Sequence, residues 1–155
     1  MNSKTLLILI ISFVLNISCL SQKKDLQLMN SISTKTENQI IKKIELTEKT
    51  RGTNRLFTFA KNSLTKNING EKTTSTLSSL QWKNILQITK MIDLQKISTY
   101  KSPTTGRYSD AALASTIIIT VDDKKYNSSD FDEGKAPKEL EALYNELQKI
   151  EENVK

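Results

Sequence analysis

The chain has 155 residues, a formal net charge of +6, one cysteine and no histidine. This length suits one folded domain. The lack of histidine excludes serine–histidine and cysteine–histidine nucleophiles and histidine-ligated zinc, and no P-loop or dinucleotide-binding glycine motif occurs. We therefore predict a protein that is not an enzyme and that holds no cofactor or metal. Paired carboxylates for glycoside hydrolysis stay open, because their geometry depends on the fold.

Charge is unevenly distributed along the chain. Residues 23–72 carry 11 lysines and arginines against 5 acidic residues, whereas residues 122–155 carry 6 against 10. A nucleic-acid-binding protein needs clustered basic residues with interleaved aromatic residues, and the sequence has no such cluster. We predict no nucleic-acid partner. The basic pair Lys23-Lys24 favours contact with anionic lipid headgroups instead.

The N-terminus has the features of an export signal. One lysine precedes an apolar run from Leu6 to Leu15, which is shorter than the roughly 20 residues that span a bilayer and is typical of a signal peptide. A small residue and Cys19 then match the end of a lipobox, although Asn16 replaces the usual aliphatic residue. We predict a lipoprotein-type signal peptide over residues 1–18, a lipid on Cys19, and a membrane-anchored protein of the cell envelope, periplasmic or on the surface. Cleavage after Ser21, which gives a soluble secreted or periplasmic protein, is the alternative.

The folded part follows a polar linker. Residues 19–38 lack a hydrophobic period, and we predict that they form a tether, with a short helix as the alternative. Residues 39–155 are predicted to form a single α+β domain. Its first signal is a hairpin, because alternating residues 43–48 and the run 56–59 flank a glycine-bearing turn. A third strand over 64–68, followed by a turn at Asn69-Gly70, is the next expectation.

Two helices and a second hairpin complete the predicted domain. Residues 78–94 show helical spacing of apolar residues, with Ser78 or Ser79 as the N-cap and Trp82 in the core. Residues 93–100 suggest a short strand. The β-branched run 117–121 indicates a central strand that turns back into 125–128. A last helix is expected from Pro137 to Ile150. The resulting fold is a mainly antiparallel sheet of four or five strands with two helices packed on one face.

Candidate binding residues lie in two loops. The loop 102–110 contains Arg107, Tyr108 and Asp110, and arginine and tyrosine are enriched at interface hot spots. Arg51 and Arg55 at the first hairpin turn are secondary candidates. In the competing interpretation, Arg107 pairs with Asp110 or another acid and only holds the loop in place.

The acidic run 129–134 places three carboxylates beside a glycine. Oxygen-rich loops can bind calcium, but the spacing lacks the calcium-hand pattern. We predict a turn between strand and helix, with Phe131 in the core and the acidic side chains of this run in solvent.

Several segments resemble those of small uncharacterised exported lipoproteins of flavobacteria: the Arg51-Gly52 turn, SPTTGRYSDAALA and FDEGKAPKEL. The same order of elements, with a hairpin, a helix that contains Trp82 and a late strand and helix, is similar to emfourin, a family of proteinaceous inhibitors of thermolysin-like metallopeptidases. That family has a glycine pair near its first hairpin, where this chain has Arg51-Gly52-Thr53, and no inhibitory residue carries over. We predict a non-enzymatic binding module whose partner is an envelope or secreted protein, with a peptidase inhibitor as the alternative.

The lipid anchor gives a first testable prediction. Replacing Cys19 with alanine removes the thiol that receives the lipid, so the variant should leave the membrane fraction while the natural protein stays in it. Fractionation and mass spectrometry of the mature N-terminus measure this. Soluble behaviour of both proteins, with Gln22 as the first residue, would overturn the lipoprotein prediction.

Overall fold

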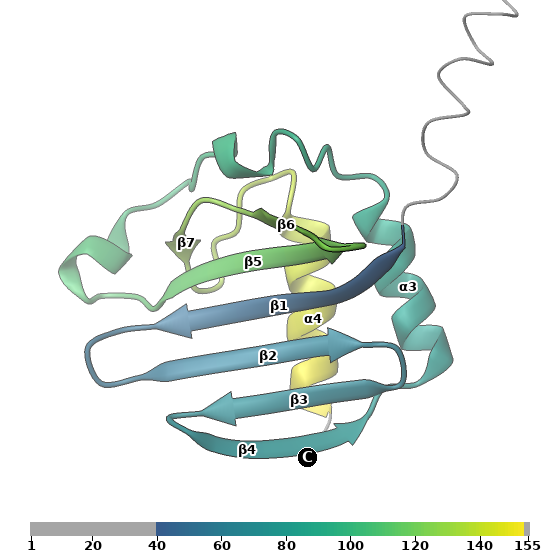
Figure 1. Ribbon diagram of the computed structural model, residues 1–155. Coiled ribbons are helices and arrows are strands. Elements are labelled where there is room, and N and C mark those ends of the chain that lie inside the picture. The colour runs from purple at the N-terminus through teal and green to yellow at the C-terminus, as the bar shows by residue number, and fades with distance from the viewer. Residues whose placement is uncertain (1–39, 154–155) are drawn as a thin grey trace, which may run out of the picture. The chain divides into compact units, whose positions relative to one another are not determined.

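The structure, a computed structural model, describes residues 40–153 (Figure 1). The predicted signal peptide 1–18, Cys19 and the tether up to residue 38 lie outside the described residues. Within the described part, no helix is long and apolar enough to cross a membrane.

The described residues form one antiparallel sheet of seven strands. Six strands follow the order β4-β3-β2-β1-β5-β6, and β7 pairs with β5. Their bounds are β1 Ile41–Lys49, β2 Asn54–Ala60, β3 Ser63–Ile68, β4 Glu71–Thr76, β5 Ala114–Val121, β6 Lys124–Asn127 and β7 Phe131–Asp132. The α+β class and the antiparallel sheet with two helices are confirmed, and the sheet has more strands than the four or five expected.

Alternation along the strands creates one buried face. In β1, Ile44, Leu46 and Glu48 are buried while the residues between them are half-buried on the other face, as the period of two in a strand requires. The predicted central strand is confirmed, because β5 has β1 on one side and β6 and β7 on the other. Ile117 and Ile119 of β5 are fully buried in the same core.

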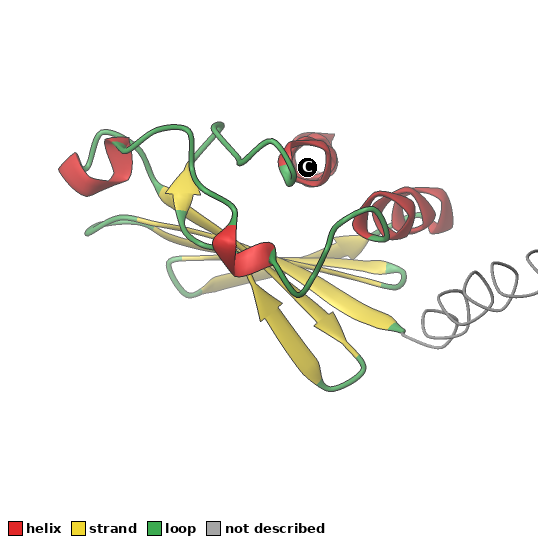
Figure 2. Ribbon diagram, turned by 90° about the horizontal axis from the view of Figure 1, so that it is seen from above, coloured by secondary structure: helices red, strands yellow, loops and turns green. Residues whose placement is uncertain are grey.

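Both helices cover this buried face (Figure 2). Helix α3 (Ser79–Thr89) begins with a capping box, in which the backbone N–H of Gln81 donates to the Ser78 hydroxyl (3.2 Å) and Gln81 accepts from the Ser78 N–H (2.9 Å). This confirms the predicted cap. Trp82 is 8% exposed and belongs to the core, as predicted.

Helix α4 (Glu141–Asn153) begins four residues later than predicted. Pro137 opens a separate turn, which closes when the Leu140 N–H donates to the Pro137 carbonyl (2.8 Å). The α-helical hydrogen bonds start only with the Tyr144 N–H, which donates to Leu140 (2.9 Å). The apolar stripe is as expected, since Leu143, Tyr144, Leu147 and Ile150 are buried.

Two further segments differ from the sequence prediction. Residues 93–100 form turns and a short 3-10 helix, η1 (Ile97–Thr99), rather than a strand. Ile97 is buried there, and Leu94 and Tyr100 are partly buried against the core, so apolar packing rather than strand pairing holds the segment. No strand was predicted over the polar residues 71–76, yet β4 extends the sheet because the Asn69-Gly70 turn, with φ of 52° and 97°, folds it back onto β3.

Candidate functional site

The predicted site residues gather at one end of the sheet. The β1–β2 loop (50–53) and the loop 101–113, which contains the 3-10 helix η2 (Gly106–Ser109), meet beyond the start of β5 (Figure 1). The Arg51 Nε lies 3.3 Å from the Asp110 Oδ2 and joins the two loops. We call residues 50–53 and 101–113 together the loop cluster.

A buried carboxylate fastens the loop cluster to the sheet. Asp132, in β7, is 3% exposed. Its Oδ2 accepts from the backbone N–H of Gly106 (2.6 Å), and its Oδ1 accepts from the backbone N–H of Arg107 and from Arg107 Nη1 (3.0 Å each). The expectation that the acids of this segment lie in solvent is therefore wrong for Asp132. The reason is that pairing of β7 with β5 turns its side chain toward the loop.

These donors control the charge of Asp132. Burial by itself raises the pKa of a carboxyl group. Hydrogen bonds from the Thr104 hydroxyl, from Arg107 and from Gly106 outweigh burial here, so the pKa of Asp132 lies well below its ordinary value. The carboxylate is ionised at neutral pH and stabilises the fold in that form.

Gly106 allows the loop backbone to lie close to the Asp132 carboxylate. A β-carbon built at this position would lie 3.1 Å from the Asp132 Oδ2 and 3.5 Å from Ala112. A larger residue would push the loop away from the carboxylate that its N–H contacts. The glycine therefore allows the short Gly106–Asp132 hydrogen bond.

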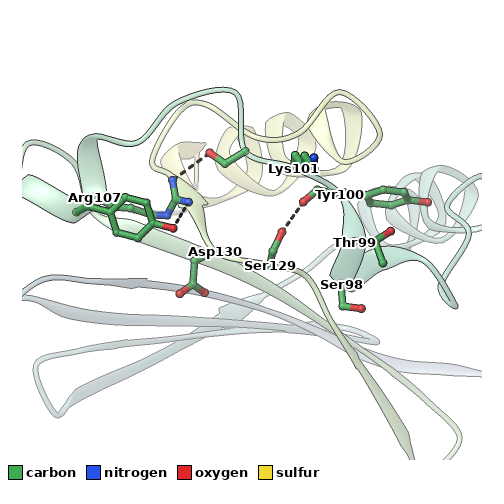
Figure 3. Close-up of a pocket in the computed structure, with 9 residues that line it drawn as sticks. Ser98, Thr99, Tyr100, Lys101, Arg107, Ser129 and Asp130 are labelled. Atoms are coloured by element: carbon green, nitrogen blue, oxygen red, sulfur yellow. Dashed lines mark hydrogen bonds between the residues drawn. The ribbon is translucent and has the colours of Figure 1, made fainter.

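Arg107 connects the buried carboxylate to an exposed ring. Its side chain is 9% exposed and also donates to the Ser102 hydroxyl (3.2 Å) and the Thr104 carbonyl (2.7 Å). Its Nη2 donates to the Tyr108 hydroxyl (2.9 Å), and its guanidinium carbon lies 4.3 Å from the Tyr108 ring centre (Figure 3). Tyr108 itself is 78% exposed. The arginine thus holds both the loop and the tyrosine.

Of the two acids considered for Arg107, the structure has the one elsewhere in the chain, Asp132, and not Asp110. Asp110 pairs with Arg51 and adopts the left-handed conformation (φ 55°). Arg55 is half-buried and its Nη1 lies 3.4 Å from Glu48 and 3.2 Å from Glu133. Arg51 and Tyr108 are open to a ligand, whereas Arg55 and Arg107 are occupied within the protein.

A second buried carboxylate lies beneath the same end of the sheet. Glu48 accepts from Gln148 Nε2 (2.7 Å) and from the Tyr144 hydroxyl (3.3 Å), both on α4. Burial and the nearby Glu133 raise the pKa of Glu48, and Arg55 only partly offsets them. Burial also raises the pKa of Tyr144 to about 12. Glu48 therefore links the sheet to α4 rather than facing a ligand.

An open depression of about 450 Å³ adjoins the loop cluster (Figure 3). Its lining includes Tyr100, Lys101, Tyr108, Ser129 and Asp130. The Ser129 hydroxyl donates to the Tyr100 carbonyl, and the Asp130 carboxylate accepts from the Thr116 hydroxyl (2.6 Å). Across residues 40–153, no three carboxylate, cysteine or histidine side chains group as metal ligands do.

No family model matches the chain, and no match was found among curated proteins or solved structures. The resemblances to flavobacterial lipoproteins and to emfourin stay predictions.

Sequence reasoning missed Asp132 and the role of Glu48. For Glu48 a signal existed, because its place in the alternation with Ile44 and Leu46 puts a carboxylate on the core side of β1. For Asp132, only the pairing of β7 with β5 reveals the contact, which joins residues 25 positions apart.

The Asp132 contact predicts a pH-dependent loss of stability. Asp132→Asn leaves the buried Arg107 charge unpaired and should lower the free energy of unfolding by about 3–5 kcal/mol near neutral pH. Because folding lowers the pKa of Asp132 below its ordinary 3.8, its contribution to stability is fully present above pH 3.8 and is lost as the pH falls from there through the lowered pKa of the folded state. Urea unfolding of both proteins should show that the difference between their free energies of unfolding narrows as the pH falls into the acid range.

The exposed Glu139 supplies the control. Glu139→Gln removes one carboxylate charge without a buried partner and should change stability by no more than about 0.5 kcal/mol at any pH. An Asp132→Asn protein as stable as the natural one at neutral pH would mean that this carboxylate does not hold the loop.

Proposed function

We propose that the chain is an exported, lipid-anchored envelope protein that acts as a non-enzymatic binding module, and that a protein partner binds the loop cluster. The observation that carries this proposal is the 78% exposed Tyr108, fixed from behind by the buried Arg107. The apolar leader and Cys19 support export and anchoring.

A fixed exposed tyrosine suits recognition. Binding costs conformational entropy when side chains and loops must be ordered at the interface. The Tyr108 ring already has a hydrogen bond and a cation–π contact with Arg107, and Arg107 is held in turn by Asp132. Tyrosine supplies a large contact area with few rotatable bonds. Much of the ordering cost is therefore met before a partner arrives.

The surroundings of Tyr108 suit the rim of a protein interface. Arg51 and Asp110 have side chains that are 92% and 53% exposed, and they pair with each other within the loop cluster. Exposed pairs of this kind contribute little to stability. Both side chains are free to exchange partners when another protein binds, which is how polar rim residues act.

Site-directed crosslinking tests the partner site. A photoreactive phenylalanine analogue in place of Tyr108 should give a discrete adduct with an envelope protein in intact cells, because the side chain would lie in the interface. Met91 is 86% exposed and lies just beyond α3, so it gives a matched control position. Adducts from neither position, or equal adducts from both, would contradict the proposed site.

A second variant separates binding from folding. Tyr108→Ala leaves the contacts of Asp132 with Gly106 and Arg107 in place, so its melting temperature should stay close to the natural value. A pull-down with this variant should no longer capture the partner protein. A variant that keeps the partner would remove Tyr108 from the proposed interface.

Peptidase inhibition is a second candidate function, favoured by the bracing of the exposed loop. Residues 102–108 are held from within by the contacts of Arg107 with Ser102, Thr104 and Asp132, and such rigidity resists cleavage. Titration of a thermolysin-type metallopeptidase with the protein should then give stoichiometric inhibition that Tyr108→Ala weakens. Full peptidase activity at a large molar excess of the folded protein would exclude this candidate.

A further inference from the structure

A second depression continues the one beside Tyr108. It has a volume of about 260 Å³ and lies between the segment 94–98 and β6. Ser98 lines both depressions. Both lie along the junction of residues 94–102 with residues 124–130, where Gln95 donates to the Tyr126 hydroxyl (3.4 Å) and Ser129 donates to the Tyr100 carbonyl. We call the two depressions together the groove; they extend from the β5–β6 turn to Tyr108.

Hydroxyl, amide and tyrosine side chains dominate this groove. The hydroxyl and amide groups belong to Ser98, Thr99, Ser102, Ser129, Gln95 and Asn127. Ser129, Ser102 and Thr99 already donate to backbone carbonyl groups, and Gln95 donates to the Tyr126 hydroxyl, so these four offer mainly their free lone pairs as acceptors. The side chains of Ser98 and Asn127 can both donate and accept. Tyr108 has Arg107 against one face of its ring, and its 78% exposure leaves the other face open. A sugar ring has hydroxyl groups around its edge, which polar side chains can bind, and a flat face, which can stack on the open face of Tyr108.

The groove is also basic. Lys101, Lys124 and Lys125 line it and are exposed, and no ion pair joins any of them to another residue within 40–153. Asp130 is the acidic residue of the lining, and the Thr116 hydroxyl already donates to it. Lysines spread along a groove attract a chain with repeated negative charges.

We propose that this groove binds an extended saccharide chain that carries carboxylate groups. Sugar hydroxyls pair with the polar lining, one ring stacks on Tyr108, and carboxylates meet Lys101, Lys124 and Lys125. A phosphate-rich polymer favours arginine forks, and the arginine of this groove, Arg107, is buried against Asp132. An acidic peptide needs apolar pockets for its anchoring side chains, whereas the aliphatic residues of the lining are limited to Leu94 and Ile97. The lining therefore suits a saccharide better than a peptide.

This groove shares Lys101, Ser102 and Tyr108 with the loop cluster, and Lys124 and Lys125 are the part of it that lies apart from that cluster. Lys124 and Lys125 follow β5 at its far end, whereas the loop cluster precedes its start. Variants of these lysines therefore leave the Tyr108 crosslink unchanged. The two proposals can fail independently.

Calorimetry with defined polymers tests the groove. The full-length protein in a neutral detergent should bind polygalacturonate and not neutral galactan, and added salt should weaken binding. The double variant Lys124→Gln with Lys125→Gln should bind at least about tenfold more weakly. Lys72→Gln with Lys83→Gln removes the same charge from exposed positions on β4 and α3 and should bind as the natural protein does.

Three results would overturn the proposal. The first is a folded natural protein that does not bind polygalacturonate. The second is equal weakening by the two double variants, which would show that only net charge matters. The third is equally tight binding of polyglutamate, lost in the Lys124 and Lys125 variant, which would assign the groove to acidic peptides.

Discussion

The contact between Asp132 and Arg107 fixes the loop 101–113. This loop has no buried apolar residue of its own, so packing alone does not determine its path. The carboxylate of Asp132 instead accepts three hydrogen bonds from Gly106 and Arg107. Asp132 itself lies in β7, which is already paired with β5. A displaced loop would leave the buried charges of Asp132 and Arg107 unpaired, which is costly.

The two buried carboxylates at this end of the sheet respond to burial in opposite ways. Asp132 has several donors, including a guanidinium, and its pKa falls. Glu48 lies deeper among protein atoms, and its pKa rises chiefly because of burial and then because of the like charge of Glu133, which Arg55 and Gln148 only partly offset. The balance between burial and the hydrogen-bond donors decides the direction. The ionised Asp132 thus stabilises the loop, whereas Glu48 contributes a polar link to α4 without favouring its own ionisation.

Regular elements could be predicted from the sequence because their signals are local. The alternation in β1, the capping Ser78 of α3 and the β-branched run of β5 each follow from neighbouring residues. β4 could not be found in this way, because its polar residues acquire a ladder only through pairing with β3. The candidate residues were predicted from residue types alone, and the three in the loop 102–110 lie at the same end of the sheet as Arg51 and Arg55 of the first hairpin. The pairing of Arg107 with Asp132 and of Arg51 with Asp110 depends on tertiary contacts.

The course of β1 sets the place of the loop cluster relative to the start of the domain. Ile40 contacts the β5–β6 turn, where its carbonyl accepts from the Asp122 N–H (2.9 Å). From there β1 crosses the sheet, and its nine residues cover about 30 Å at a rise of roughly 3.3 Å each. Ile40 therefore lies at the end of the sheet opposite to Arg51 and the loop cluster, because the whole length of β1 separates them.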